Sequence, residues 1–169
     1  MQVDVHIDDY FFSQEGTNSD RSFNVNFWET WFSGWLEHLS SEYELPAAEA
    51  YELSLRLSDD EDIQRFNAQY RDQNKPTDVL SFAALEVDVP QPTGGWTISE
   101  PLYLGDILIS VETASRQAQQ QGHSLTVELA WLGAHGLLHL LGWDHPDEES
   151  LQEMLSTQET LLEVVGLRL

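Results

Sequence analysis

The sequence contains no cysteine among its 169 residues. Disulfide bonds, thiolate zinc sites, iron–sulfur clusters and cysteine nucleophiles are therefore all excluded, and any bound metal must be held by His, Asp or Glu. Basic residues are also scarce, because 7 Lys and Arg stand against 30 Asp and Glu, for a formal net charge of −23. This balance excludes a diffuse basic surface for nucleic acid or anionic lipid.

Long hydrophobic runs are missing as well. No apolar stretch approaches the roughly 18 residues that a membrane span needs, and the first residues lack the basic and apolar regions of a secretory signal. We therefore expect a cytoplasmic protein without a membrane association. The chain is 41% hydrophobic and has six Trp, which favours a packed core over disorder, and its length suits one domain spanning residues 1–169.

Hydrophobic periodicity predicts an alternation of strands and helices. Apolar residues alternate with polar ones in a way that predicts strands at 3–7, 51–57, 77–83 and 102–110. Helical spacing predicts helices at 27–39, 59–69, 111–121, 124–141 and 146–165, the last opened by Pro146. Residues 13–22 and 86–101 are predicted surface loops, the second irregular with three Pro and two Gly. These patterns indicate one α/β or α+β domain with a mixed sheet.

Three of the six histidines lie within one eleven-residue segment, HGLLHLLGWDH, at 135–145. His135 and His139 are four residues apart on a predicted helix, so their rings project from the same face. Gly142 is placed to end that helix, and a turn there can bring His145 to the same point. Three imidazoles suit Zn²⁺ and leave its fourth tetrahedral position for water. The alternatives are histidines with a purely structural role, and a closed site with Asp144 as fourth ligand.

The same spacing occurs in the zinc peptidase pattern H-E-x-x-H-x-x-G-x-x-H. Here, however, Gly136 occupies the position of the glutamate that serves those enzymes as general base. A peptidase is therefore disfavoured, although the metal ligands remain.

The few basic residues are unevenly distributed. A 20-residue window holds four of the seven: Arg56, Arg65, Arg71 and Lys75. An arginine on a loop can present its planar guanidinium to a phosphate. The alternative is surface ion pairing with the abundant carboxylates.

Two further segments accompany the histidine motif, and together they resemble one known family. HGLLHLLGWDH matches the H-G-x-L-H-L-x-G-[YW]-D-H signature of the YbeY family of ribosomal-RNA maturation endoribonucleases. The segment NAQYRDQNKPTDVLSF at 67–82 is similar to that family's N-x-x-[YF]-R-x-x-[DN]-x-P-T-D-V-L-S-F, and LGDI at 104–107 looks like its L-G-D-I. The resemblance covers residues 50–165.

The resemblance implies a fold, a cofactor and a function. The fold would be α+β, with a mixed sheet of roughly four strands and about five helices. One zinc ion per chain would be held by His135, His139 and His145. The activity would be metal-dependent cleavage of single-stranded RNA in rRNA end processing, small-subunit maturation and ribosome quality control. Partners would be an rRNA precursor, the small ribosomal subunit and ribosomal proteins or assembly factors, with no DNA expected.

The resemblance also implies roles for single residues. Arg71 and His135 are the expected catalytic residues, Arg71 would bind an RNA phosphate, and Asp106 would orient a ligand histidine as a carboxylate behind the metal ligands. From the basic window, Lys75 is a second expected phosphate-binding residue. Either a zinc-bound hydroxide or the RNA 2′-OH can attack phosphorus. If Arg56 and Arg65 also faced the metal, they would complete a positive slot within an acidic shell. Two alternatives remain: a non-catalytic assembly factor with structural zinc, and a zinc hydrolase of another substrate class.

Overall fold

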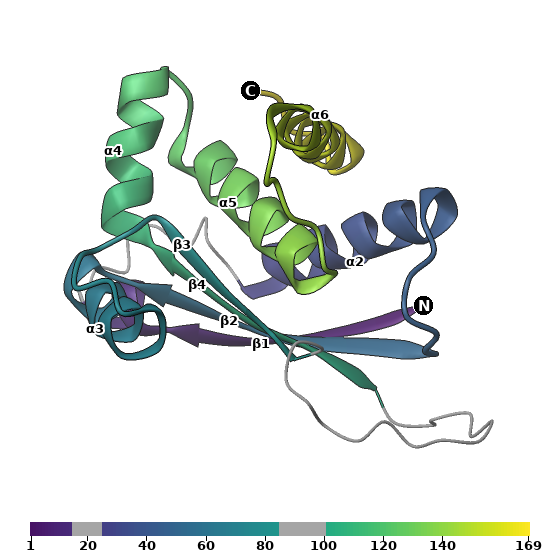
Figure 1. Cartoon of the computed structure of the whole chain (residues 1–169), viewed down its shortest axis with the longest axis horizontal. Helices are drawn as coiled ribbons and strands as arrows, with labels where there is room; N and C mark the ends of the chain where they lie inside the picture. Colours follow the sequence, from purple (N-terminus) through teal and green to yellow (C-terminus); the bar gives the residue numbers. More distant parts are fainter. Residues whose placement is uncertain (15–24, 85–100) are drawn as a thin grey trace.

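The computed structural model describes residues 1–14, 25–84 and 101–169 (Figure 1). The two predicted loops, 13–22 and 86–101, therefore lie almost wholly outside the described residues. In these ranges the chain forms one α+β domain built on a single sheet.

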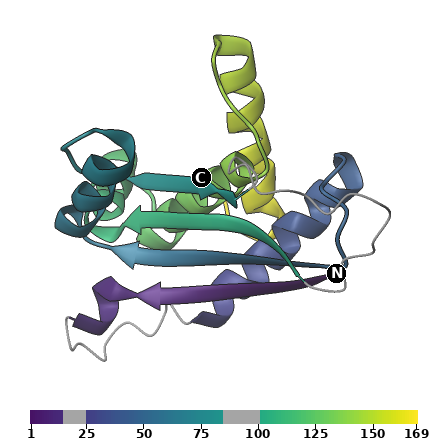
Figure 2. The same ribbon diagram turned by 60° about the horizontal axis from the view of Figure 1, so that its bottom comes forward.

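The sheet has four strands, as expected: β1 (Gln2–Asp9), β2 (Ala50–Ser58), β3 (Val79–Ala83) and β4 (Leu102–Ser110). Their order is β1-β2-β4-β3 (Figure 2). β1, β2 and β4 run parallel, whereas β3 pairs antiparallel with β4 and forms one edge. The predicted mixed sheet is thus confirmed, and its strand order, which the periodicity left open, places β3 beside β4.

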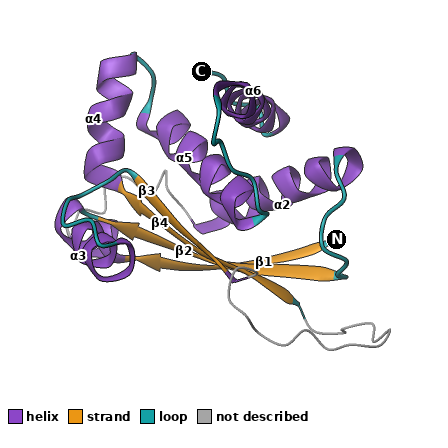
Figure 3. Cartoon of the chain, viewed as in Figure 1, coloured by secondary structure: helices purple, strands orange, loops and turns teal. Residues whose placement is uncertain are grey.

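Six helices connect or follow the strands within the described ranges (Figure 3). They are α1 (Tyr10–Gln14), α2 (Val25–Glu42), α3 (Asp60–Arg71), α4 (Val111–Gln121), α5 (Leu125–Leu140) and α6 (Glu148–Val164). The extra helix relative to the expected five is the short α1. None of the helices in the described part of the chain combines the length and apolar character required to cross a bilayer.

One face of the sheet carries the main core. Helices α2, α4, α5 and α6 lie on that side, with α6 beyond α2 and α5 (Figure 1). α2 supplies four nearly inaccessible aromatic residues, Trp28, Trp31, Phe32 and Trp35, whose rings stack or meet edge to face. Burying rings of this size contributes about 2–3 kcal/mol each. The aromatic spacing of this helix therefore reflects packing, as the sequence predicted.

Helix starts follow the expected capping chemistry with one exception. Asp59 caps α3 and Ser124 caps α5, each side chain accepting a backbone N–H of the first turn. The prediction that Pro146 opens the last helix is wrong. α6 begins at Glu148, because the Asp147 carboxylate accepts the Ser150 N–H while the Ser150 side chain reaches back, forming a capping box.

Candidate metal centre

Helix α5 carries the first two histidines of the site. Its apolar residues are buried between the sheet and α6, and hardly any residue along the helix is exposed to solvent. His135 and His139 are half-buried on its remaining face, four residues apart. Because α5 is held on both sides, the positions of these two rings are set by the core.

The turn after α5 delivers the third histidine. The Gly142 N–H donates to His139 O at 3.0 Å, and the Trp143 N–H donates to Leu138 O at 2.9 Å. Gly142 has φ of 95°, a left-handed conformation that glycine adopts without a Cβ clash. The chain thus reverses direction immediately after the helix, and exposed His145 comes back beside the other two rings.

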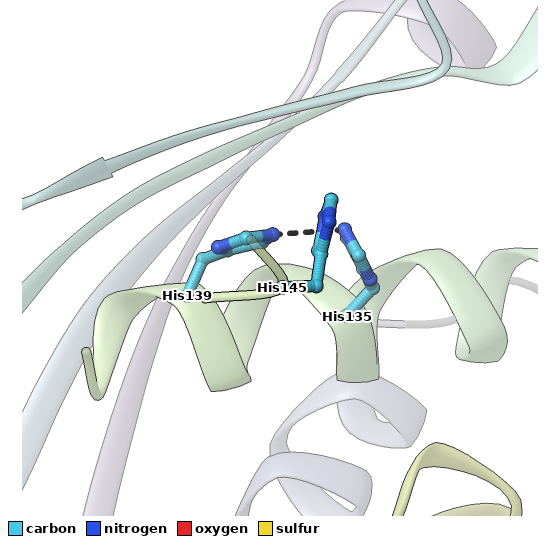
Figure 4. A group of neighbouring side chains, drawn as sticks. All are labelled: His135, His139 and His145. Carbon is cyan, nitrogen blue, oxygen red and sulfur yellow. Dashed lines mark hydrogen bonds between the residues drawn. The ribbon is translucent and has the colours of Figure 1, made fainter. Parts of the chain in front are cut away.

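The three rings converge (Figure 4). Their centroids lie 4.5 Å apart for His135 and His139, 5.9 Å for His135 and His145, and 5.6 Å for His139 and His145. Each offers one nitrogen, and these nitrogens all lie within 4.8 Å of one another, the Nε2 atoms of His135 and His139 being 3.0 Å apart. This group can hold a metal ion, since neutral imidazoles are ligands for Zn²⁺ and other transition metals.

Burial favours the neutral, metal-binding form of the two histidines on α5. Desolvation lowers the pKa of both His135 and His139 from the ordinary value of 6.5, and in His139 the neighbouring histidines lower it further. A lowered pKa keeps the rings neutral near pH 7, which is the form that binds metal.

The close packing of α5 on the sheet explains why position 136 is a glycine and not the glutamate of zinc peptidases. A Cβ at Gly136 would lie 2.8 Å from Cγ2 of Ile107 on β4, closer than side chains pack. The position faces the sheet, so a glutamate there would have no room. The absence of the peptidase glutamate, noted from the sequence, therefore has a steric reason.

Arg71 is brought to the histidines by the sheet edge. It is the last residue of α3, and its Nη2 donates to Ser81 O of β3 at 2.6 Å, while its guanidinium lies 5.0 Å from the ring centroid of Phe82. Arg71, His135 and His139 line one cavity of about 290 Å³. Among the described residues no carboxylate forms an ion pair with Arg71. Its remaining N–H groups are therefore available to an anion.

The other arginines of the basic window do not face the metal site, and the expected positive slot is wrong in that respect. Arg56 Nε donates to Asp62 Oδ2 at 2.7 Å, and Arg65 Nη2 donates to Asp62 Oδ1 at 2.8 Å. Asp8 is a further partner of Arg56. Ion pairing, the alternative considered for the whole window, accounts for these two residues.

Lys75 lies near the site in sequence but outside its cavity. It is exposed in the connection between α3 and β3, where its carbonyl accepts from Asn67 Nδ2 at 2.9 Å. It does not line the cavity that contains Arg71. The structure therefore gives its proposed phosphate contact no support.

Asp106 lies away from the histidines. Its strand neighbour Ile107 faces Gly136 of α5, so alternation turns Asp106 to the opposite side of the sheet. There it accepts a 2.6 Å hydrogen bond from the Tyr103 hydroxyl; burial and this bond raise the pKa of Tyr103 to about 12. The expectation that Asp106 orients a ligand histidine is corrected accordingly.

The residue that contacts His135 from α6 is Gln158, which the sequence analysis did not single out. Its Oε1 lies 3.1 Å from His135 Nδ1. A signal existed: Gln158 is a lone amide on the apolar face of its helix, in register with buried Met154, Leu161 and Leu162.

Fold and site together define a class, an α+β domain with a solvent-accessible group of three histidines that can hold a metal ion and an arginine beside it. A model of the family described as Endoribonuclease YbeY matches residues 14–166. The chain belongs to the YbeY family.

Individual relatives carry the name of the same family. The chain is 56% identical over 175 residues to a protein of Nostoc sp. named Endoribonuclease YbeY, covering 100% of this chain and 93% of the relative. It is 55% identical to the protein of that name from Trichormus variabilis, covering 100% and 97%. A solution structure of a Thermotoga maritima protein shares the fold, with a TM-score of 0.57 and 23% identity over 95% of this chain and 88% of that one.

Proposed function

We propose that this protein is a zinc-dependent endoribonuclease that cleaves single-stranded RNA. The observation that carries the proposal is the shared cavity, in which His135 and His139 lie beside Arg71, an arginine with no carboxylate partner within residues 1–14, 25–84 and 101–169. A metal cation and a guanidinium together form a local positive site that matches a phosphodiester. The names of the relatives support RNA as the substrate.

His135, His139 and His145 would hold the metal. When bound, zinc supplies Lewis acidity and lowers the pKa of a coordinated water to about 7. The donor set fits the ion, because three neutral imidazoles leave one tetrahedral position open. The exposure of His145 agrees with an open, substrate-accessible site rather than an enclosed structural one.

Arg71 would bind a non-bridging phosphate oxygen. Its bond to Ser81 O and its position over Phe82 fix the guanidinium, so little side-chain entropy is lost when RNA binds. Fixed donors aimed at developing charge stabilise a phosphorane-like transition state more than the ground state. Arg71 and His135 are thus the residues proposed to act in catalysis.

The biological substrate we propose is an rRNA precursor in the cytoplasm, processed during small-subunit maturation and ribosome quality control. The net charge of −23 supports a role for a partner, because most of the surface repels free RNA. A small ribosomal subunit, ribosomal proteins or assembly factors would provide the basic surface that the enzyme lacks.

The test is cleavage of a defined rRNA precursor by the wild type, with His139→Ala and a chelator as metal-free controls. We expect about one zinc per wild-type chain, less than 0.1 in His139→Ala, and cleavage reduced about 100-fold or more without metal. A 2′,3′-cyclic phosphate end would assign attack to the RNA 2′-OH, whereas a 5′-phosphate end would assign it to water. Wild-type protein with zinc but no cleavage of free or particle-bound precursor would favour a non-catalytic assembly factor.

A further inference from the structure

Gln158 is a fully buried amide beside the metal centre. Its side chain projects from α6 toward α5 and is 0% exposed. We propose that Gln158 is a positioning residue that fixes the tautomer and the ring orientation of His135, so that Nε2 is the ligand atom. This inference rests on the proposed function only in taking the histidines as metal ligands.

The two ends of the amide identify its orientation. Gln158 Nε2 lies 3.3 Å from Trp131 O, and Oε1 lies 3.1 Å from His135 Nδ1. A backbone carbonyl can only accept, so the NH₂ end must face Trp131. With the amide reversed, two oxygens would face each other. The Trp131 carbonyl therefore decides which atom of Gln158 meets the histidine.

The orientation of the amide then decides where His135 carries its proton. The Gln158 oxygen can only accept, so His135 Nδ1 must be protonated to bond with it. A neutral imidazole has one N–H, which leaves the Nε2 lone pair free. That atom is the one that lies 3.0 Å from His139 Nε2, within the converging group. The two hydrogen bonds that link the Trp131 carbonyl, Gln158 and His135 thus leave Nε2 of His135 as the nitrogen that can bind a metal.

Packing alone does not account for a glutamine at this position. Met154 and Leu161 occupy the same face of α6 with 0% exposure. A methionine would fill the space of Gln158 without burying an amide, which costs free energy unless it is hydrogen-bonded. Partners that orient ligand histidines typically change metal affinity 10- to 100-fold when removed.

The experiment uses the full chain with Gln158→Met, Gln158→Glu and a control, Leu161→Ala. Long-range ¹H–¹⁵N NMR at pH 8 on metal-free protein reports the histidine tautomers, and chelator competition reports zinc affinity. We expect wild type and Gln158→Glu to keep His135 protonated at Nδ1, because a buried, protonated glutamic acid still presents one oxygen as acceptor to His135 and its O–H as donor to Trp131 O. Gln158→Met should lose this preference and bind zinc about 10- to 100-fold more weakly.

The control separates positioning from stability. Leu161→Ala should lower the melting temperature while leaving the tautomer and zinc affinity unchanged, since it removes packing from the same helix face. Unchanged tautomer and affinity in Gln158→Met, or loss of both in Leu161→Ala, would overturn the proposal. If Gln158→Met does not fold, loss of the Nδ1–H form in folded Gln158→Glu overturns it. Failure of RNA cleavage by wild type would instead count against the proposed function and leave this result intact.

Discussion

Arg71 at the β3 edge of the sheet and Arg56 on the face away from α5 illustrate opposite uses of the same side chain. On the side away from α5, Arg56 is held by Asp62 and Asp8 and lies over the rings of Tyr10 and Phe66, at 4.6 and 5.6 Å. At the β3 edge, Arg71 bonds to a backbone carbonyl and stacks on Phe82. The charge of Arg56 is balanced by two carboxylates, whereas no carboxylate of the described ranges pairs with Arg71, whose charge can act on a ligand.

The difference shows that a cluster of cations in sequence does not define a binding surface. Asp62, 1% exposed, bonds to both Arg56 and Arg65 and removes them from the positive site. In a chain with a net charge of −23, the local positive potential depends on which cations escape pairing. In the part of the chain that the structure describes, Arg71 contacts a backbone carbonyl and an aromatic ring and pairs with no carboxylate.

The sharpest test of this contrast is neutralisation of each arginine. Arg71→Gln should reduce RNA cleavage about 100-fold at unchanged zinc content, because it removes a charged donor from the transition state. Arg65→Gln is the matched control and should leave cleavage within about twofold, since Arg65 faces Asp62. Initial rates with metal analysis measure both, and equal losses in the two variants would refute the contrast.

The ion pair of Arg56 with Asp62 should affect the stability of the fold instead of RNA cleavage. Asp62→Asn should lower the free energy of unfolding by about 3 kcal/mol, because it leaves Arg56 without its buried partner. The loss is at the lower end of the range for buried pairs, since the Arg56 side chain is 25% exposed. Zinc affinity should not change. Asp106→Asn, which removes no ion pair seen among the described residues, is the control for urea unfolding and should cost less than about 1 kcal/mol.

Acid should destabilise the histidine group and the Arg56–Asp62 pair in different pH ranges. Burial lowers the pKa of His135 and His139, so the unfolded chain takes up their protons first, and metal-free protein should lose stability as the pH falls below about 6.5. For Asp62, burial alone would raise the pKa, but bonds from Arg56 outweigh it and the net pKa is lowered from 3.8. That contribution should be complete above about pH 4 and lost below it.

Melting curves of chelated protein at successive pH values measure both windows. His139→Gln should reduce the loss near pH 6, whereas Asp62→Asn should reduce the loss near pH 4. A single loss below pH 4 that His139→Gln leaves unchanged would contradict the assignment to histidine.

The smallest expected effect is at Lys75. Lys75→Ala should slow cleavage less than about threefold at 150 mM salt, because the side chain lies outside the cavity and acts only through a screened field. Rates at low and physiological salt would show it. A loss as large as that of Arg71→Gln would restore Lys75 as a direct RNA contact.

Local periodicity predicted the elements well. The alternation around Leu53, Leu55 and Leu57 is β2, in which these three residues are buried, and the aromatic spacing from Trp28 is α2. These patterns are readable because helices and strands repeat at fixed intervals along the chain. The spacing of His135 and His139, with Gly142 after them, predicted the convergence of the three rings for the same reason.

The sequence by itself determined the histidine motif, the family resemblance and the order of the elements, because each is encoded within a few neighbouring residues. Only the tertiary structure decided the side of the sheet on which Asp106 lies, the pairing of Arg56 and Arg65 with Asp62, and the contact of Gln158 with His135. The contact of Gln158 joins α6 to α5 and the pair of Arg56 with Asp62 joins β2 to α3, while the position of Asp106 depends on which face of the sheet packs against α5. Side-chain chemistry supplies the candidates, and the packing of α5 between sheet and α6 selects among them.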